Sequence, residues 1–296
     1  MSTTLHYFMA NRAEAQRLAS GLGIASLPIE TRPFPDGESF VRVGKSTSTA
    51  LLYCSLDRPD AKMVPLLLAA SALRDGGANR IVLIAPYLCY MRQDRAFSAG
   101  EAVSQRVIGK LIAASFDGLI TVDPHLHRTP SLQAVAPGIV AITVSAAATI
   151  ARTLATMTTP DTLLVGPDEE SRQWVDAIAA PLGLDVMICT KTRRGDRTVE
   201  IALPDKSRAS GRPVMLVDDI ISSGGTLNAC ARLLRAGGAT RISAVATHCL
   251  ANGKDLDSLF ENGIDPVRAT DTIPGPAADI SIAPALAEAI CAHNFV

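Results

Sequence analysis

The sequence predicts an α/β protein of two domains, each a mostly parallel sheet flanked by helices. Short apolar runs rich in β-branched residues alternate with longer runs of helical periodicity from end to end, which is typical of βαβ units. The 296 residues correspond to about two domains. The pattern breaks at Thr158-Thr159-Pro160-Asp161, so we expect one domain over residues 1–145 and a second over 146–296.

The individual elements follow from periodicity and from stop signals. Two of the expected helices end in Gly-Gly, and the segments there, Leu73 to Ile81 and Leu234 to Ile242, are nearly alike. This echo suggests two related domains, although a shared way of ending a helix would also produce it. The expected strands are 5–9, 50–55, 80–85, 119–122, 139–142, 162–165, 185–190, 198–203, 214–217 and 242–248. The expected helices are 13–22, 61–75, 101–115, 146–155, 170–182, 226–236, 254–262 and 284–293.

Composition and charge exclude several classes of protein. The chain is 48% apolar and 19% charged with a net charge of -1, so no overall positive field draws it to nucleic acid or an anionic membrane. The longest apolar run, 63–73, is about half a membrane span, and the N-terminus lacks a signal-peptide pattern. Six cysteines without a CxxC pair lie mostly in apolar runs, as reduced buried thiols do. We therefore expect a cytoplasmic protein that binds neither nucleic acid nor membrane.

The most informative segment runs from Pro213 to Thr226. Four apolar residues lead into Asp218 and Asp219, a serine and glycine loop follows, and a helical pattern begins at Thr226. The amides of such a loop and the helix dipole favour a phosphate, while a carboxylate at the strand end accepts hydrogen bonds from sugar hydroxyls. A sugar phosphate fits better than a nucleoside triphosphate because the P-loop lysine is missing, and the alternative is a turn with capping residues only. The loop consists of Ser222, Ser223, Gly224, Gly225 and Thr226.

A second strand end carries arginines. Arg92 and Arg95 follow the strand expected at 80–85, where doubly wound sheets bind ligands. The arginines can bind phosphate oxygens, and Gln93 can read the amide-like edge of a base. The alternative is a surface loop with ordinary ion pairs.

Two further strand ends carry imidazoles or acids. Asp123, His125 and His127 alternate, so in an extended backbone they point to one side. They are either ligands of a divalent ion, with imidazole better suited to manganese than to magnesium, or a hydrogen-bonded histidine pair. Asp168 follows the strand expected at 162–165 and is either a helix cap or a ligand of metal or sugar.

Two loops have both an ordinary and a functional interpretation. The segment 32–38 is a proline-bracketed turn, and beside a nucleotide site its Phe34 offers a stacking face and its acids offer acceptors for an amino group. The segment 191–197 has four cations and a glycine between two strand-like runs. It is either a solvated hairpin tip or a cationic flap that closes over transferring phosphates.

In this order along the chain, the motifs resemble those of the ribose-phosphate diphosphokinases, the phosphoribosyl pyrophosphate synthetases. The resemblance extends over nearly the whole chain. The run around Asp218 is common to phosphoribosyltransferases, whereas the arginine motif with the acidic turn upstream distinguishes the synthetases. The matching motifs are Phe34-Pro35-Asp36-Gly37-Glu38, Tyr90-Met91-Arg92-Gln93-Asp94-Arg95, Asp123-x-His125, Pro167-Asp168, Lys191-x-Arg193 and Asp218 to Thr226.

The resemblance implies two phosphoribosyltransferase-type domains with the active site between them, in a dimer-based homo-oligomer. It implies transfer of the β,γ-diphosphoryl group of ATP to the 1-hydroxyl of ribose 5-phosphate, with Mg²⁺ or alternatively Mn²⁺, and release of AMP. Carried over residue by residue, the ATP site is Phe34, Asp36, Gly37, Glu38, Arg92, Gln93, Asp94 and Arg95, with the acidic turn reaching a neighbouring subunit. The ribose 5-phosphate site is Arg193, Asp218, Asp219, Ser222, Ser223, Gly224, Gly225 and Thr226, the metal ligands are His125 and Asp168, and the catalytic flap is Lys191 and Arg193.

The chain departs from the commonest branch of that family at two places. Leu126-His127-Arg128 and Glu169-Glu170 stand where that branch has small residues, so the resemblance decides neither allosteric control by phosphate and ADP nor the exact metal coordination. Two alternative functions are a phosphoribosyltransferase of nucleotide salvage and a catalytically silent regulatory subunit. A second domain with its own nucleotide motif disfavours the first, and the presence of Lys191, Arg193 and Asp218 disfavours the second.

Overall fold

The computed structural model describes the backbone of residues 2–194 and 198–296, and their side chains except those of 191–194 and 198–200. The chain forms two compact units: unit 1 is Met1–Ser145 with Ile282–Val296, and unit 2 is Ala146–Ser281. The sequence-based division assigns 282–296 to the second domain, whereas these residues pack in unit 1. They pack there because the apolar side chains of Leu286, Ile290 and Phe295 are buried in unit 1.

Unit 1 is built on a seven-stranded sheet with the order β3-β2-β1-β4-β5-β6-β7. Neighbouring strands are parallel except in the β2–β3 hairpin, which is antiparallel. Strands β4 and β6 are buried along their whole length, as expected for a parallel sheet covered on both faces. The strands are β1 (Thr3–Phe8), β2 (Ala25–Pro33), β3 (Ser39–Arg42), β4 (Thr49–Tyr53), β5 (Arg80–Ala85), β6 (Gly118–Val122) and β7 (Val140–Val144).

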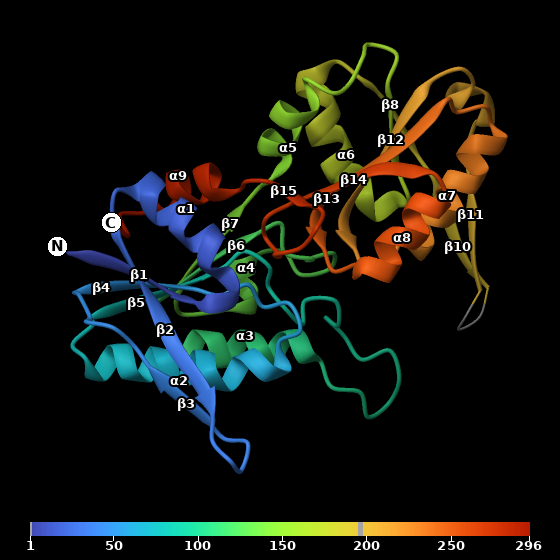
Figure 1. The fold of residues 1–296 in the computed structure, drawn as a ribbon. Helices are drawn as coiled ribbons and strands as arrows, with labels where there is room; N and C mark the ends of the chain where they lie inside the picture. Colours follow the sequence, from blue (N-terminus) through green and yellow to red (C-terminus); the bar gives the residue numbers. More distant parts are fainter. Residues whose placement is uncertain (1, 195–197) are drawn as a thin grey trace. The chain divides into compact units, whose positions relative to one another are not determined.

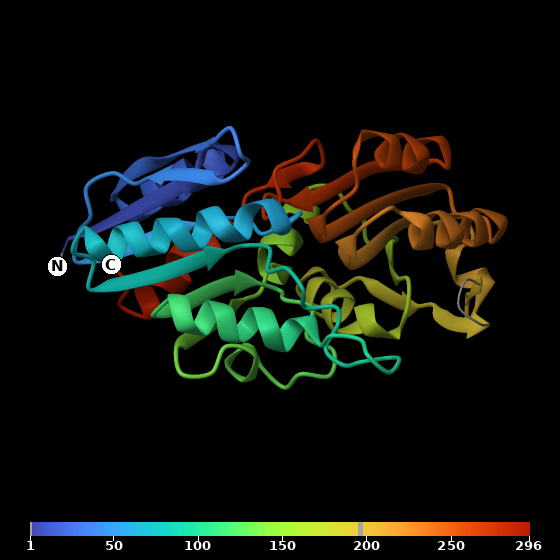
Figure 2. The same ribbon diagram turned by 90° about the horizontal axis from the view of Figure 1, so that it is seen from below.

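Helices cover both faces of this sheet. Figure 1 shows α1 and α9 on one face and α2 and α3 on the other, and Figure 2 looks at the unit from the α2 and α3 side. The C-terminal helix packs on α1 and near β7, and the carbonyl of Phe295 accepts a hydrogen bond from Thr3 at 3.4 Å. The helices are α1 (Arg12–Leu22), α2 (Asp60–Asp75), α3 (Ser104–Ser115), α4 (Leu132–Val135) and α9 (Ala283–Ala292).

Unit 2 has a six-stranded parallel sheet with the order β15-β14-β13-β12-β8-β9 and a separate antiparallel hairpin, β10–β11. Figure 1 shows α5 and α6 on one face of the sheet and α7 and α8 on the other. The strands are β8 (Leu163–Gly166), β9 (Asp185–Ile188), β10 (Thr190–Arg194), β11 (Thr198–Ala202), β12 (Pro213–Ile221), β13 (Arg241–Cys249), β14 (Ile264–Thr270) and β15 (Ala278–Ile280). The helices are α5 (Ala147–Leu154), α6 (Arg172–Ala179), α7 (Gly225–Ala236) and α8 (Gly253–Glu261).

The sequence echo corresponds to one backbone geometry repeated in both units. Gly77 and Gly238 have φ values of 97° and 90°, a region that favours glycine. Each glycine amide donates to a carbonyl three residues earlier, at 3.0 Å in both cases. Six strands also follow one another in matching order, β2-β1-β4-β5-β6-β7 in unit 1 and β9-β8-β12-β13-β14-β15 in unit 2. These matches support the interpretation of two related domains.

The α/β fold class of two mostly parallel sheets is confirmed, and several elements differ from expectation. Strands β2, β3, β14 and β15 are not among the expected strands, and the helix expected at 101–115 begins only at Ser104. Five of the six cysteines are buried and none forms a disulfide. Within the described ranges, the helices are all too short or too polar to cross a membrane.

Candidate active site

The strand that carries the adjacent carboxylates is longer than the sequence predicts. β12 continues past both acids to Ile221, and Asp218 pairs in register with Ala246 of β13. The amide of Asp219 donates to the side chain of Asp218 at 3.0 Å. Desolvation raises the pKa of Asp218 well above its usual range, and the charges of Asp219 and Asp168 raise it further. Three carboxylates therefore gather at one end of the sheet in unit 2.

The loop after β12 opens helix α7. Gly224 is the N-cap residue with φ +75°, and a Cβ added there would lie 2.7 Å from Leu259, so the backbone requires glycine. Within the described residues no side chain caps α7, although capping is the alternative interpretation of this run. The first amides of α7 are thus not satisfied by a side-chain cap, and Ser222, Ser223 and Gly225 are exposed beside them.

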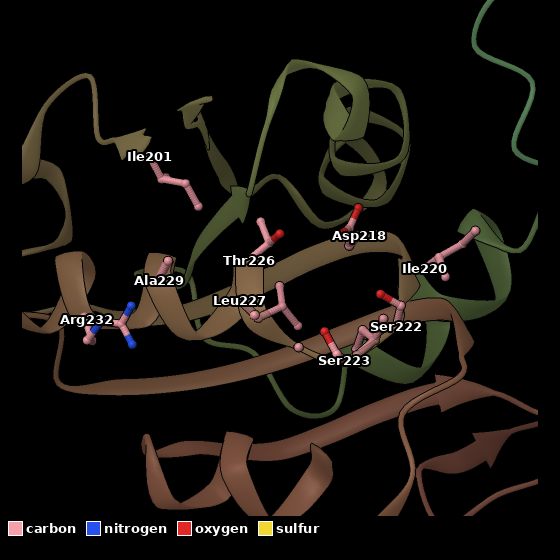
Figure 3. A pocket seen from close by; sticks show the side chains of 12 residues that line it. Ile201, Asp218, Ile220, Ser222, Ser223, Thr226, Leu227, Ala229 and Arg232 are labelled. Carbon is pink, nitrogen blue, oxygen red and sulfur yellow. The ribbon is translucent and has the colours of Figure 1, made fainter. Parts of the chain in front are cut away.

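These residues line a pocket of about 420 Å³. Figure 3 shows Asp218, Ser222 and Ser223 toward one end of the pocket and Thr226 near its middle. Ile201 of β11 and Arg232 of α7 lie toward the other end. Arg232 is absent from the sequence-based site. The sequence does contain a signal for it. Thr226, Ala229 and Arg232 are three residues apart, a spacing that places them on one face of a helix.

Asp168 acts as a helix cap in the structure. Its side chain accepts a hydrogen bond from the amide of Ser171 at 3.3 Å, at the start of a short 3-10 turn, Glu169–Ser171. The neighbouring Glu169 forms an ion pair with Arg172 at 2.6 Å. A capping role is compatible with binding a metal or a sugar as well. β8 lies beside β12, and Asp168 is near enough to Asp218 for its charge to raise the pKa of Asp218.

The candidate flap corresponds to the hairpin β10–β11. Lys191 and Arg193 lie on β10, opposite Ile201 and Val199 of β11. The side chains of both cations and of Val199 lie outside the described residues, as do residues 195–197 altogether. A β-hairpin at this position agrees with both interpretations of the segment, a solvated tip and a closing flap.

In unit 1 the arginine motif lies in the loop between β5 and α3. Arg92 and Arg95 are exposed, and the guanidinium of Arg95 lies 5.0 Å from the ring centre of Phe97. Tyr90, at the start of the motif, has φ +61°, and its hydroxyl contacts Asp60 of α2. Gln93 lies within 3.4 Å of Glu101. The loop is therefore a structured segment with its arginines presented outward.

The histidines in the next loop form a pair. Nε2 of His127 lies 3.1 Å from Nδ1 of His125, with the rings at 87° to each other. One of the two alternative interpretations, a hydrogen-bonded pair, is thus present. Asp123 differs from the two histidines in burial: it is buried, whereas they are half-buried. Its φ is +34°. His125 belongs to unit 1 and Asp168 to unit 2.

The acidic turn is the tip of the β2–β3 hairpin, which projects from unit 1 (Figure 1). The amide of Glu38 donates to Asp36 at 3.1 Å, and Gly37 has φ +90°. Arg32 lies over the ring of Phe34 at 4.9 Å and over Phe40 at 4.3 Å. The tip therefore presents an exposed aromatic ring beside two exposed acids.

A serine and glycine loop that joins a central parallel strand ending in acids to a helix is typical of α/β proteins of the phosphoribosyltransferase class. Comparison with known proteins agrees: the profile of the phosphoribosyl transferase domain matches residues 136–261, and that of the N-terminal domain of ribose phosphate pyrophosphokinase matches residues 4–115. The ribose-phosphate pyrophosphokinase of Methanopyrus kandleri is 37% identical over 278 residues, 93% of this chain and 94% of that protein. That of Thermococcus kodakarensis is 35% identical over 89% of this chain and 92% of its own.

Among solved structures, phosphoribosylpyrophosphate synthetase from Mycobacterium smegmatis is similar, with a TM-score of 0.83 and 28% identity over 99% of both chains. The chain belongs to the ribose-phosphate pyrophosphokinase family, which confirms the resemblance drawn from its motifs.

Proposed function

We propose that the chain transfers the β,γ-diphosphoryl group of ATP to the 1-hydroxyl of ribose 5-phosphate, giving 5-phosphoribosyl 1-diphosphate and AMP. The observation that carries the proposal is the loop of Ser222 to Thr226 at the uncapped start of α7, with Asp218 beside it. A phosphate at these amides would place the ribose toward the carboxylates of Asp218 and Asp219. Full-length similarity to ribose-phosphate pyrophosphokinases supports the same activity.

ATP binding is assigned to unit 1. Arg92 and Arg95 are exposed and supply positive charge for the triphosphate, and Gln93 offers an amide for the base. The exposed tip of the β2–β3 hairpin, with Phe34, Asp36, Gly37 and Glu38, is assigned to the adenine of a neighbouring subunit. This assignment makes the active form a homo-oligomer.

The chemical step is an in-line displacement at the β-phosphorus. The 1-hydroxyl of ribose 5-phosphate loses its proton to solvent as its oxygen forms the new bond to phosphorus, and the bond to the α,β-bridging oxygen breaks, so AMP leaves. Such transfers need positioning and charge stabilisation more than covalent assistance. Lys191 and Arg193 are assigned to stabilising the charge that develops on the bridging and equatorial oxygens.

The residues present fit a divalent cation. Asp168, Asp218 and Asp219 offer carboxylate oxygens at one sheet end. Burial first, and then the charges of Asp219 and Asp168, raise the pKa of Asp218, and a cation would offset those charges. Mg²⁺ bound with ATP would neutralise phosphate charge, with Asp168 as an oxygen ligand. His125 is the other ligand that the motif implies. Its Nδ1 lies beside His127, and imidazole suits Mn²⁺ better than Mg²⁺.

One assay tests the proposal. The chain is incubated with ATP, Mg²⁺ and ribose 5-phosphate, and AMP is measured with and without the sugar phosphate. We expect AMP release that depends on ribose 5-phosphate. Consumption of the diphosphate product in the presence of a purine base would instead indicate a phosphoribosyltransferase, and inactivity until a second subunit is added would indicate a regulatory chain.

A further inference from the structure

Two neighbouring loops of unit 1 carry the nucleotide-binding candidates. Loop A, residues 86–103, runs from β5 to α3 and carries Arg92 and Gln93. Loop B, residues 123–131, runs from β6 to α4 and carries His125. Because β5 and β6 are parallel neighbours, both loops start at the same end of the sheet. Side chains of α3 and of the loops themselves connect them.

The first connection is Gln105 in the first turn of α3, which is 6% exposed. Its Nε2 donates to the carbonyl of Met91 and its backbone amide donates to the carbonyl of Gln93, each at 3.3 Å. Since Met91 and Gln93 flank Arg92, Gln105 fixes the backbone on both sides of an exposed arginine. Its Oε1 accepts from the hydroxyl of Thr129 in loop B at 2.7 Å. One buried amide thus uses both its donor and its acceptor to link the loops.

The second connection is an ion pair. Nη1 of Arg128 in loop B lies 2.9 and 3.1 Å from the two carboxylate oxygens of Asp94 in loop A. The side chain of Asp94 is 6% exposed, whereas that of Arg128 is 46% exposed. A nearly buried carboxylate that already contacts a cation has little surface left for a ligand, and its charge repels phosphates. The geometry therefore does not favour direct contact between Asp94 and ATP.

We propose that Gln105, with the Asp94–Arg128 pair, positions the nucleotide-binding side chains of loop A against loop B. These are positioning residues: Gln105 acts through the backbone around Arg92, and Asp94 acts through Arg128 instead of binding ATP as its motif implies. The inference rests on the proposed function, because it takes loop A to be the nucleotide site.

The test of Gln105 is the variant Gln105→Leu, which keeps side-chain size and removes both hydrogen bonds. We expect the Kd and KM for ATP to rise about tenfold or more, as when supporting partners of a ligand shell are removed, while the KM for ribose 5-phosphate stays within about twofold. Thr129→Val, which deletes only the hydroxyl donor, should raise the KM for ATP by less. It also serves as the test if Gln105→Leu does not fold.

A matched control is Gln133→Leu in α4. The side-chain amide of Gln133 also forms hydrogen bonds with backbone groups, but none of these groups belongs to loop A. Its Nε2 donates to the carbonyls of Ala136 and Ile139, and its Oε1 accepts from the amide of Ala141. Gln133→Leu should lower Tm without changing the KM for ATP. Equal loss of ATP affinity in Gln105→Leu and Gln133→Leu would mean a general loss of stability and would overturn the positioning role.

The test of the ion pair is a double-mutant cycle with Asp94→Asn and Arg128→Gln. If Asp94 acts through Arg128, the double variant should lose no more ATP affinity than either single variant. Additive losses would show independent roles and restore Asp94 as a direct ligand. If Gln105→Leu leaves the Kd for ATP unchanged while the wild type forms AMP, the positioning inference is overturned and the proposed function stands. A wild type that forms no AMP overturns the proposed function instead.

Discussion

The backbone amide of Asp219 donates a hydrogen bond to the carboxylate of Asp218 at 3.0 Å, so these two adjacent acids of unit 2 are directly linked. The arrangement is unfavourable for the ionised protein, because desolvation and the charges of Asp219 and Asp168 raise the pKa of Asp218. A sugar hydroxyl or a cation bound here would relieve that cost. With such a ligand bound, the carboxylate cluster would destabilise the folded protein less than it does in the empty protein.

The first prediction follows from this pKa. A raised folded pKa means that stability is full below the unfolded value, near 3.9, and falls as pH rises through the folded value. Asp218→Asn should therefore raise Tm at pH 7, and the gain should shrink on acidification. The same variant should raise the KM for ribose 5-phosphate far more than that for ATP. Thermal unfolding across pH and steady-state kinetics measure the two effects.

Asp205→Asn provides a control of opposite sign. Hydrogen bonds from the side chain and the backbone of Ser207 lower the pKa of Asp205, so its charge is favoured in the folded state. The control should lower Tm at pH 7 or leave it unchanged. A lower Tm for Asp218→Asn at pH 7 would contradict the argument.

The second prediction compares two adjacent glycines. Gly224→Ala should lower Tm and abolish sugar-phosphate binding, because φ is +75° and the new Cβ meets Leu259 at 2.7 Å. At Gly225 the nearest atom to a new Cβ is 3.9 Å away, so Gly225→Ala should leave Tm unchanged or higher. If a phosphate approaches this backbone, Gly225→Ala should still raise the KM for ribose 5-phosphate. An unchanged KM would show that the phosphate binds elsewhere.

The third prediction concerns the hairpin β10–β11. If its cations stabilise the transition state, Lys191→Ala should lower kcat by about a thousandfold or more and leave both KM values within a few-fold. If the hairpin tip is only solvated, kcat should change less than about threefold. Lys254→Ala, on the exposed start of α8, is the matched loss of a surface lysine and should leave kcat unchanged.

The fourth prediction concerns assembly. If Glu38 completes a neighbour's site, a mixture of Glu38→Ala and Lys191→Ala subunits should form hybrid dimers with one intact site each, or about a quarter of all sites. If Glu38 serves its own subunit, no site in the mixture is intact. Mixing Lys191→Ala with Arg193→Ala, both on one hairpin, is the control that should restore nothing. Activity of the mixture is compared with that of each variant alone.

The fifth prediction concerns His6 in β1. His6 is fully buried, its ring nitrogens have no hydrogen-bond partner in the part of the chain that the structure describes, and burial lowers its pKa to about 4. The unfolded chain then binds the proton more readily, so stability should fall by about 3 kcal/mol as pH drops from about 6.5 to about 4. His6→Leu should flatten that part of the pH profile, while His293→Leu, at the exposed end of α9, should not.

The sequence predicted the buried parallel strands well, because fully covered strands read as continuous apolar runs. The β2–β3 hairpin was not expected because β2 alternates little and contains Pro28, which argues against a central strand. β14 likewise contains Pro266. Local sequence patterns predict such exposed or proline-containing strands poorly, because tertiary packing stabilises them.

The position of the candidate phosphate loop could be predicted because a strand, two acids and small residues follow one another locally in the sequence. The serine and glycine loop lies between β12 and α7 as expected, and its binding of a sugar phosphate stays a prediction. Asp94 illustrates what sequence does not show: a carboxylate within a ligand motif has a partner, Arg128, 34 positions away in the chain. Arg232 illustrates another limit, since a helix cation gains meaning only once the pocket beneath it is known.

The return of residues 282–296 to unit 1 fixes an order of events during synthesis. Unit 1 begins before unit 2 in the sequence, but Leu286 and Phe295, which are also buried in unit 1, are translated after the whole of unit 2. Unit 2, by contrast, is one uninterrupted segment of chain and has all its strands before Ile282. Domains generally fold as units while the chain grows. The unit that begins first in the sequence is therefore completed only after the whole of unit 2 has been synthesised.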